Sequence, residues 1–266
     1  MKQVGADGDG QGIGFVPLGI IFDVDDTLLD NHPPESELGL HELARLLALR
    51  EVGEKHGFAT LATVERELNR AIVKRSKEHT TDGHIWQVLY ELGLVESDTI
   101  DHSNVLLSEI ATRKHELYDP VLKEFGAPLP KAIEFVKAVY ILTGGRIAIA
   151  SGAQYSNVIT FLEMTGLIDY FLPERIICYQ HIAHAKPDPE AFDLAFKTLG
   201  LPDSARAQVV AFEDEPKGIT SAKGAGLYAA AITTRYDRSD LELCDPAPDI
   251  IRSSYIEFAN AFGITL

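Results

Sequence analysis

Short apolar runs that stop abruptly at polar residues are the feature that most restricts the fold of this chain. The first is Leu-Gly-Ile-Ile-Phe at residues 18–22, and similar runs follow at 146–150, 208–212 and 228–232, with a weaker one at 175–178. A continuous apolar run of this length, bounded by turn residues, is typical of a strand buried on both faces of a parallel sheet. The runs therefore predict five strands of one parallel sheet.

Segments with helical periodicity separate these runs. Apolar residues recur at the i, i+3, i+4 and i+7 positions of 192–199, with Asp188 and Pro189 as helix start signals and Gly200 as the stop. Helices are also expected over 133–140 and 155–164. Strands that alternate with helices of this length indicate βαβ units. The predicted fold class is therefore α/β, a Rossmann-like parallel sheet sandwiched by helices. In such sheets ligands bind beyond the carboxyl ends of the strands, which is where the polar residues gather here.

Residues 33–120 interrupt this alternation. They are charged and Leu-rich, with helix-like segments at 41–47 and 64–77 and no convincing strand, and prolines mark both borders. We therefore expect an all-helical domain over 33–120, inserted after the first strand. A few long helices packed on the same core are the alternative.

The remaining residues are expected to form the tail and the core. The Gly-rich residues 1–16 are predicted to be a flexible N-terminal tail. Residues 17–32 and 121–266 are predicted to form the Rossmann-like core, because they contain all five predicted strands.

The charge of the chain limits its partners. Its 266 residues include 24 Lys and Arg against 40 Asp and Glu, a formal net charge of −16 at pH 7. Nucleic acid and an anionic membrane surface both require a basic face, so we expect neither as a partner. No run reaches the roughly 18 apolar residues that span a bilayer. The two cysteines, Cys178 and Cys244, make no disulfide framework, and we expect a cytoplasmic protein.

Four acids follow the first predicted strand within eight residues, namely Asp23, Asp25, Asp26 and Asp30. Like charges at this spacing repel one another, and low-dielectric surroundings strengthen the repulsion. A divalent cation explains the cluster better than a surface turn with excess acid, because Mg²⁺ takes oxygen ligands and keeps positions for water and phosphate. The segment therefore predicts a Mg²⁺ site.

Further polar groups stand at the later strand ends and before a helix. Ser151 ends the second strand, where Gly152 allows a tight turn, and its hydroxyl and nearby N–H groups can hold anionic oxygens. Lys186 lies in a turn before the 192–199 helix and can neutralise a phosphoryl group. Glu213 and Asp214 supply acids that complete a magnesium site. Their order along the chain, at strand ends and helix starts, makes the set specific.

These residues resemble the four motifs of the haloacid dehalogenase superfamily of phosphohydrolases. The DxDxT motif matches residues 23–27, the Ser or Thr after a hydrophobic strand matches Ser151, the KPxP segment matches 186–189, and the acidic pair matches 213–214. The resemblance runs from about residue 18 to 232 and is closest to the β-phosphoglucomutase-like group. In that group a helical cap is inserted between the first and second motifs, so the resemblance implies that residues 33–120 form such a cap.

The resemblance implies a role for each motif residue in phosphoryl transfer. Asp23 would attack phosphorus in line and form an aspartyl-phosphate. Asp25 would protonate the leaving oxygen and then take a proton from the attacking water. Ser151 and Thr27 would bond phosphoryl oxygens, and Lys186 would offset their charge.

The resemblance also implies the ligands of the metal. Mg²⁺ would be held by Asp23, the backbone carbonyl of Asp25, and Asp214, with Glu213 as a direct ligand or a partner of the ligands. The motif acids bring a charge of −4 and Lys186 returns +1; these acids are Asp23, Asp25, Glu213 and Asp214. A phosphate dianion would not enter this field without a divalent cation.

Two positions depart from the family pattern. Glu215 follows the acidic pair where the family often has Ser. Residues 36–41, Ser-Glu-Leu-Gly-Leu-His, resemble the entrance to the family's cap, whose His assists the phosphoglucomutases, but a few extra residues precede them here. His41 is therefore either a substrate-binding residue, as Gly152 is expected to be, or a solvated residue at a helix start.

Hydrolysis of a small phosphate monoester is the leading hypothesis, because a helical cap that closes over the site favours small substrates. A phosphomutase acting on a sugar phosphate uses the same core residues with a different acceptor, and it stays open as the alternative. Dehalogenation needs neither an acid at Asp25 nor a metal, and a phosphorylated receiver domain is shorter and carries no helical insertion. The expected partner is a small phosphorylated metabolite, and the oligomeric state is left open.

Overall fold

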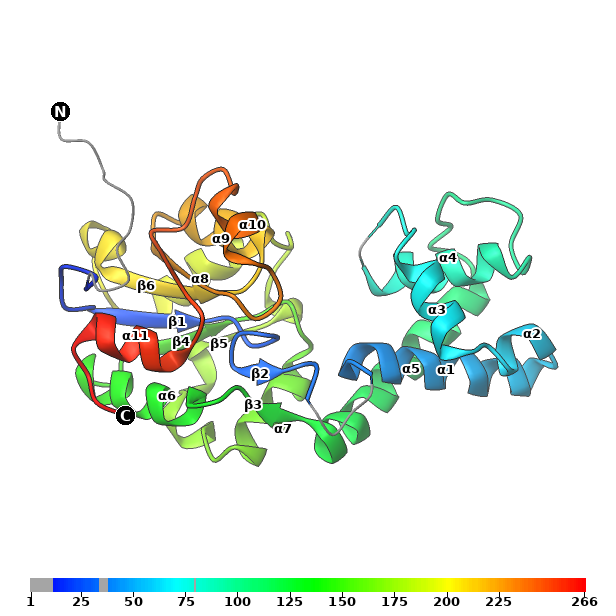
Figure 1. Ribbon diagram of the computed structural model, residues 1–266, viewed down its shortest axis with the longest axis horizontal. Helices are drawn as coiled ribbons and strands as arrows, with labels where there is room; N and C mark the ends of the chain where they lie inside the picture. The colour runs from blue at the N-terminus through cyan, green and yellow to red at the C-terminus, as the bar shows by residue number, and fades with distance from the viewer. Residues whose placement is uncertain (1–11, 34–37, 79) are drawn as a thin grey trace. The chain divides into compact units, whose positions relative to one another are not determined.

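The computed structural model describes residues 12–33, 38–78 and 80–266 (Figure 1). They form two compact units. The core unit comprises residues 12–30 and Ala127–Leu266, and the helical unit comprises the described part of Asn31–Gly126.

The core unit contains a six-stranded parallel sheet in the order β5-β4-β1-β6-β7-β8, which confirms the predicted fold class. The strands are β1 (Gly19–Phe22), β4 (Ile147–Ala150), β5 (Ile176–Ile177), β6 (Val209–Glu213), β7 (Tyr228–Ile232) and β8 (Ile250–Arg252). All five predicted strands are present, and β8 was not predicted. A short antiparallel pair, β2 (Leu29–Asp30) with β3 (Ala127–Pro128), was not predicted either.

Side chains of the central strands alternate between two apolar layers, as the pleat requires. On one face Ile21 packs in a buried cluster with Phe192 of α8 (Glu190–Thr198) and Ile219 of α9 (Pro216–Gly224). On the other face the stacked rings of Phe22 and Phe212 contact aromatic side chains of α6 (Ala132–Leu142) and α11 (Tyr255–Phe262). Each fully buried Phe contributes roughly 1.5–3 kcal/mol.

The remaining α-helices of the core unit are α7 (Tyr155–Met164) and α10 (Arg238–Glu242). The predicted helix at 155–164 has the same bounds as α7. Helix α8 begins at Glu190, directly after the predicted start signals at 188 and 189, and ends at Thr198, two residues before the predicted stop at Gly200. Gly200 follows α8 with a φ of 69°, the left-handed conformation that ends many helices and favours glycine.

In its described part, the helical unit contains five α-helices around an apolar core of its own. They are α1 (Leu40–His56), α2 (Ala59–Ala62), α3 (Arg66–Val73), α4 (Thr81–Glu91) and α5 (Val105–Phe125). The buried core includes Leu49 from α1, Ile72 from α3, Trp86 from α4 and Ile110 from α5. Among the described residues, no helix is both long and apolar enough to span a membrane.

Helix α5 continues past Pro120, where the end of the inserted domain was expected. Proline removes one i→i−4 hydrogen bond from a helix. Buried Tyr118, Val121 and Leu122 nevertheless anchor both sides of Pro120, and the helix ends at Phe125. The border between the two units therefore lies at Gly126 rather than at Pro120.

The described part of the expected flexible N-terminal tail contacts the core unit. Residues 1–11 lie outside the described residues. The N–H of Ile13 donates to the carbonyl of Ala261 at 3.1 Å, and the ring of Phe15 lies edge-on to Tyr228 at 5.2 Å between centroids. Ile13 and Phe15 therefore pack on the core unit.

Candidate active site

The motif residues of the core unit lie at the carboxyl ends of three adjacent strands. Asp23 follows β1, Ser151 follows β4, and Glu213 ends β6 with Asp214 next to it. Because β1 lies between β4 and β6, the ends of these strands adjoin. The N–H of Asp23 donates to the carbonyl of Phe212 at 3.0 Å, which ties the two acidic segments together.

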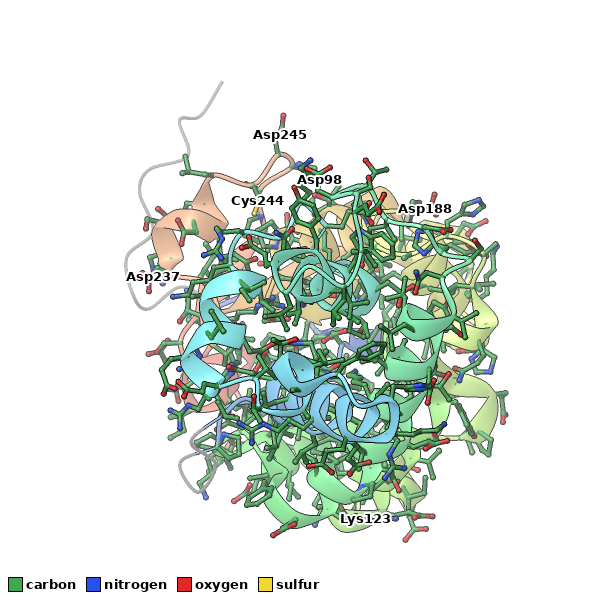
Figure 2. All side chains as sticks on the ribbon, turned by 90° about the vertical axis from the view of Figure 1, so that its right-hand side faces the viewer. Asp98, Lys123, Asp188, Asp237, Cys244 and Asp245 are labelled. Carbon is green, nitrogen blue, oxygen red and sulfur yellow. The ribbon has the colours of Figure 1, made fainter. Side chains whose placement is uncertain are left out.

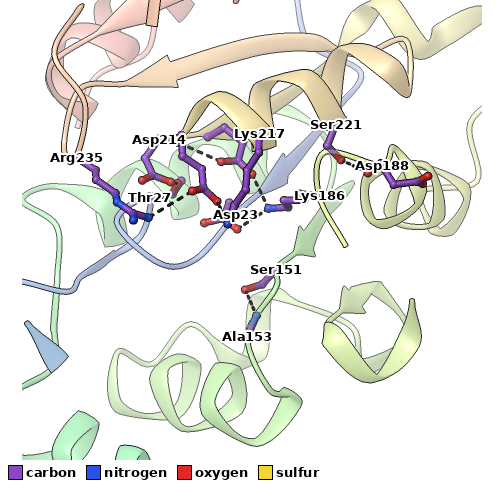
Figure 3. Close-up of polar contacts among 12 residues, drawn as sticks. Asp23, Thr27, Ser151, Ala153, Lys186, Asp188, Asp214, Lys217, Ser221 and Arg235 are labelled. Carbon is purple, nitrogen blue, oxygen red and sulfur yellow. Dashed lines mark hydrogen bonds and ion pairs between the residues drawn. The ribbon is translucent and has the colours of Figure 1, made fainter. Parts of the chain in front are cut away.

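Lys186 connects two of the acids. Its ammonium donates to Asp23 Oδ1 at 2.7 Å and to Glu213 Oε1 at 2.5 Å (Figure 3). All three side chains are buried. The ammonium also lies 4.9 Å from the ring centroid of Phe192, so the ring's negative face adds to its stabilisation. The loop before α8 thus contributes the cation that the sequence predicted.

The third acid keeps one oxygen unpaired. Asp214 Oδ2 is buried and has no hydrogen-bond partner among the described residues, whereas Oδ1 lies 3.5 Å from the hydroxyl of Thr27. One carboxylate oxygen each from Asp23, Glu213 and Asp214 lie within 4.8 Å of one another. An orphaned buried carboxylate oxygen beside two further carboxylates is a donor set that fits a hard divalent cation such as Mg²⁺.

Burial and mutual repulsion dominate the electrostatics of this cluster. Burial raises the pKa of Asp23 well above its usual value, and Lys186 only partly reverses this. Burial, then Glu213 and Asp23, raise the pKa of Asp214. Burial alone would lower the pKa of Lys186, but Asp23 and Glu213 outweigh it and hold that pKa above its ordinary value. Three acids and one ammonium therefore leave an excess of buried negative charge that a cation would neutralise.

Other acids of the core unit have a different environment. Asp237 and Asp245 are exposed to solvent (Figure 2). Hydration stabilises such carboxylates without a partner. They contribute to the net charge of the chain but not to the cluster at the strand ends.

A second group that could hold a metal lies around the loop that carries Lys186. It consists of His184, Asp188 and Glu190. The Glu190 carboxylate already accepts hydrogen bonds from the N–H groups of Ala183 and His184, at 3.0 and 2.7 Å, and the His184 side chain is exposed. These contacts fix the loop ahead of α8, and we assign no metal to them.

Gly218 of α9 makes room for the Glu213 carboxylate. A Cβ at position 218 would lie 2.0 Å from Glu213 Cδ, far inside van der Waals contact. The carboxylate therefore sits directly against the helix backbone, and any larger residue at position 218 would displace it. No local sequence signal explains a glycine at this position, because the close contact arises only in the fold.

Ser151 occupies the predicted position, while Gly152 differs from its expected role. Ser151 is buried, and its hydroxyl oxygen accepts from the N–H of Ala153 at 3.1 Å, so its proton is left for another acceptor. Gly152 was expected to permit a tight turn. Its backbone is outside the left-handed region, and a Cβ there would contact nothing within 4 Å, so the turn does not require glycine.

His41 belongs to the helical unit, where it is the second residue of α1 and half-buried. Its ring stacks on Tyr118 at 4.3 Å between centroids, and its Nδ1 lies 3.1 Å from the ammonium of Lys114. Because an ammonium only donates, Nδ1 of His41 is the acceptor of this bond. Of the preceding cap-entrance residues, Ser36 and Glu37 lie outside the described residues.

Several residues to which the sequence analysis assigned no role lie beside the motif residues. Glu215, the residue that departs from the family pattern, lies 3.4 Å from Arg235 and 3.2 Å from Lys217. Tyr255 and Thr234 donate hydroxyl hydrogen bonds to backbone carbonyls of the segment that follows Asp23. Because the partners of these two hydroxyls are main-chain carbonyls, no sequence motif marks the interactions.

The fold is a Rossmann-like α/β fold with an acidic cluster at the carboxyl ends of its strands, and comparison with known proteins identifies the family. A family model described as haloacid dehalogenase-like hydrolase matches residues 18–226. The chain therefore belongs to the haloacid dehalogenase-like hydrolases, and it is an enzyme of the phosphatase type.

Individual relatives agree with this membership. The fructose-1-phosphate phosphatase YqaB of Escherichia coli is 28% identical over 215 residues, which cover 80% of this chain and 95% of YqaB. A phosphorylated carbohydrates phosphatase of Thermotoga maritima is 26% identical over 208 residues, which cover 78% of this chain and 81% of that protein.

Solved structures share the fold. CbbY of Rhodobacter sphaeroides, in complex with phosphate, superposes with a TM-score of 0.63 at 24% identity, over 90% of this chain and 95% of CbbY. A proposed β-phosphoglucomutase of Thermotoga maritima gives a TM-score of 0.61 at 22% identity, over 91% of this chain and 96% of that chain.

Proposed function

We propose that this protein is a Mg²⁺-dependent phosphatase that hydrolyses a small phosphorylated sugar or polyol through an aspartyl-phosphate intermediate. One observation carries the proposal. Three buried carboxylates, from Asp23, Glu213 and Asp214, lie close together, and the Lys186 ammonium pairs with only the first two. One oxygen of Asp214 has no partner among the described residues. A cation and an anionic substrate would together complete this set of charges.

Asp23 is the proposed nucleophile. It directly follows the central strand, and the hydrogen bond from Lys186 fixes its Oδ1, which leaves Oδ2 for in-line attack on phosphorus. A carboxylate is a weak nucleophile, so position and charge neutralisation supply most of the acceleration. The attack forms a bond between Asp23 and phosphorus and breaks the ester bond, and water then hydrolyses the aspartyl-phosphate.

Asp25 is the proposed acid and base. Its side chain is half-buried, whereas Asp23 is buried, so Asp25 can exchange protons with the leaving group and with water. Ser151 is proposed to donate its remaining hydroxyl proton to a phosphoryl oxygen. Thr27 was predicted from the sequence to do the same. Its hydroxyl faces Asp214 instead, so we propose that it orients that carboxylate.

The proposed metal ligands are Asp23, the backbone carbonyl of Asp25, and Asp214, with Glu213 close to them. When bound, Mg²⁺ would polarise the phosphoryl group and stabilise the charge that develops on its oxygens. The chain already supplies one positive charge of its own, because Lys186 forms ion pairs with Asp23 and Glu213. The orphaned Oδ2 of Asp214 would gain its missing partner.

The substrate class is proposed from the names of two relatives. YqaB is named a fructose-1-phosphate phosphatase, and the protein from Thermotoga maritima is named for phosphorylated carbohydrates. A phosphomutase remains the alternative, because the residues proposed here would serve either acceptor.

The test is a panel of phosphorylated sugars and polyols, incubated with purified protein and either Mg²⁺ or a chelator. We expect phosphate release from at least one ester, complete loss in chelator, and recovery on adding Mg²⁺. Full activity in chelator would exclude the metal assignment. Interconversion of β-glucose-1-phosphate without phosphate release would instead identify a mutase. An aspartyl-phosphate trapped in an Asp25→Asn variant would support Asp23 as the nucleophile.

A further inference from the structure

The segment that carries Asp23 and Asp25 is a tight backbone loop with an unusual conformation. The carbonyl of Val24 accepts hydrogen bonds from the N–H groups of Thr27, Leu28 and Leu29, at 3.2, 2.8 and 2.9 Å. Within the loop Asp26 has a φ of 55°, a left-handed conformation that is unfavourable for a non-glycine residue. Such a conformation persists only when the surroundings enforce it.

Two side-chain hydroxyls from the C-terminal part hold adjacent carbonyls of this loop. The hydroxyl of Tyr255, the first residue of α11, donates to the carbonyl of Thr27 at 2.7 Å. The hydroxyl of Thr234, just after β7, donates to the carbonyl of Asp26. The two bonds therefore hold the two consecutive peptide groups on either side of the Thr27 Cα.

We propose that Tyr255 and Thr234 are positioning residues that hold the Asp23–Thr27 loop in its reactive conformation. The part of this inference that concerns turnover rests on the proposed phosphatase function. Both residues lie outside residues 18–226, the part of the chain that matches the family model. Neither contacts the reacting atoms, so each would act through the backbone of the loop.

The environment of Tyr255 suits this role. Its side chain is completely buried, with its ring among Phe135, Phe212 and Phe258. Burial and the nearby charges of Asp23 and Asp214 raise its pKa well above the ordinary value. The hydroxyl therefore stays protonated and remains a donor across the whole range in which enzymes work.

The loop needs such restraint because its charges oppose it. Asp23 and Asp25 repel each other, and burial of Asp23 strengthens the repulsion. Phosphoryl transfer requires the attacking oxygen in line with the leaving oxygen, and small misplacements are costly. Two external donors to consecutive carbonyls fix the loop without adding charge to the site.

Amide hydrogen exchange tests the restraint without reference to turnover. Tyr255→Phe removes only the hydroxyl and keeps the buried ring. We expect exchange of the Thr27, Leu28 and Leu29 amides to accelerate about fivefold, which corresponds to the loss of one hydrogen bond, while the amides of β7 are unaffected. Unchanged exchange in these three amides would overturn the proposal, whether or not the protein proves to be a phosphatase.

Kinetics test the link to catalysis. In Tyr255→Phe and in Thr234→Val we expect kcat to fall about tenfold with KM nearly unchanged, because the loop is misplaced but the substrate contacts remain. Thr234→Ser keeps a hydroxyl and should restore kcat. A fall in thermal stability alone, with wild-type kcat in the folded protein, would reduce both residues to a structural role and contradict the proposal.

A matched control separates positioning from the general loss of a buried hydroxyl. Thr143 follows α6 at the opposite end of the sheet, where its buried hydroxyl donates to the carbonyl of Val139 at 2.8 Å. Thr143→Val should leave kcat and the exchange of the loop amides unchanged. If the wild-type protein hydrolyses no phosphate ester, the proposed function is wrong. The exchange measurement would still show whether the Tyr255 hydroxyl restrains the loop.

Discussion

Lys186 in the core unit and Lys55 in the helical unit form ion pairs of the same length in opposite environments. Lys186 lies 2.7 Å from Asp23, and Lys55 lies 2.7 Å from Glu109. The Lys186 side chain is 7% exposed and the Lys55 side chain is 68% exposed. From distance alone, the two ion pairs would be expected to contribute equally to stability.

Burial makes them different. Water screens the exposed pair and hydrates both partners when it opens, so its net contribution is small. The buried pair has no such alternative, and removing one partner leaves a charge without solvation. The ion pairs around Lys186 are therefore maintained at an energetic cost, as expected of a functional site.

The largest effect is expected at the proposed nucleophile. Asp23→Asn keeps the size of the side chain and its contact with Lys186 but removes the attacking carboxylate. Turnover should fall by on the order of 10⁴-fold, while circular dichroism and the melting temperature stay close to the wild-type values.

The control for this variant is Asp188→Asn, because the amide oxygen can still accept the hydrogen bond from the N–H of Glu190. That variant should keep its activity within a few-fold. Comparable losses in both variants would mean that negative charge around the site, rather than a nucleophile at position 23, is what turnover requires.

The next largest effect is expected for Lys186→Met, which removes the ammonium and keeps an apolar side chain. kcat should fall about 10²–10³-fold, the cost of one donor that stabilises developing charge. The variant should also lose about 3 kcal/mol of unfolding free energy at pH 8, because Asp23 and Glu213 lose their common partner.

The pH dependence of that loss has a defined sign. Burial already raises the pKa of both acids. In the variant the folded state therefore binds protons before the unfolded state does as the pH falls. The variant should regain stability as the pH is lowered from 8 toward 5, which urea unfolding at several pH values would measure. A pH-independent loss would contradict the buried-charge explanation.

A smaller effect is expected for Gly218→Ala. The new methyl group would collide with the Glu213 carboxylate and displace it from Lys186. Activity should fall about 10²-fold, as small misplacements of catalytic groups do. Gly224→Ala, on the same helix, is the matched control, because its Cβ would lie 3.3 Å from the nearest atom of Pro189. Equal activities in the two variants would argue against the close fit around Glu213.

The sequence predicted the parallel sheet because burial on both faces produces continuous apolar runs, which stand out from amphipathic helices. Strand β8 was missed because it has only three residues, Ile250–Arg252, and lies at the sheet edge, where no long apolar run is needed. The border at Gly126 was missed because packing around Pro120 outweighs the local signal of a proline.

The site was predictable where its chemistry requires particular side chains at strand ends, as at Asp23, Ser151 and Glu213. Lys186 could be placed in a turn before a helix, but its contact with two acids depends on the tertiary fold. Tyr255 and Thr234 gave no signal, because they bind backbone carbonyls, and any nearby sequence supplies a carbonyl.

The smallest effect is expected for Lys55→Met, which makes the same substitution as at Lys186 in the exposed pair. Glu109 also contacts His56 at 2.8 Å and stays hydrated, so it needs no single partner. Unfolding free energy and kcat should both be indistinguishable from wild type, measured by urea unfolding and by phosphate release alongside Lys186→Met. A loss in Lys55→Met as large as that in Lys186→Met would show that burial does not set the difference between the two ion pairs.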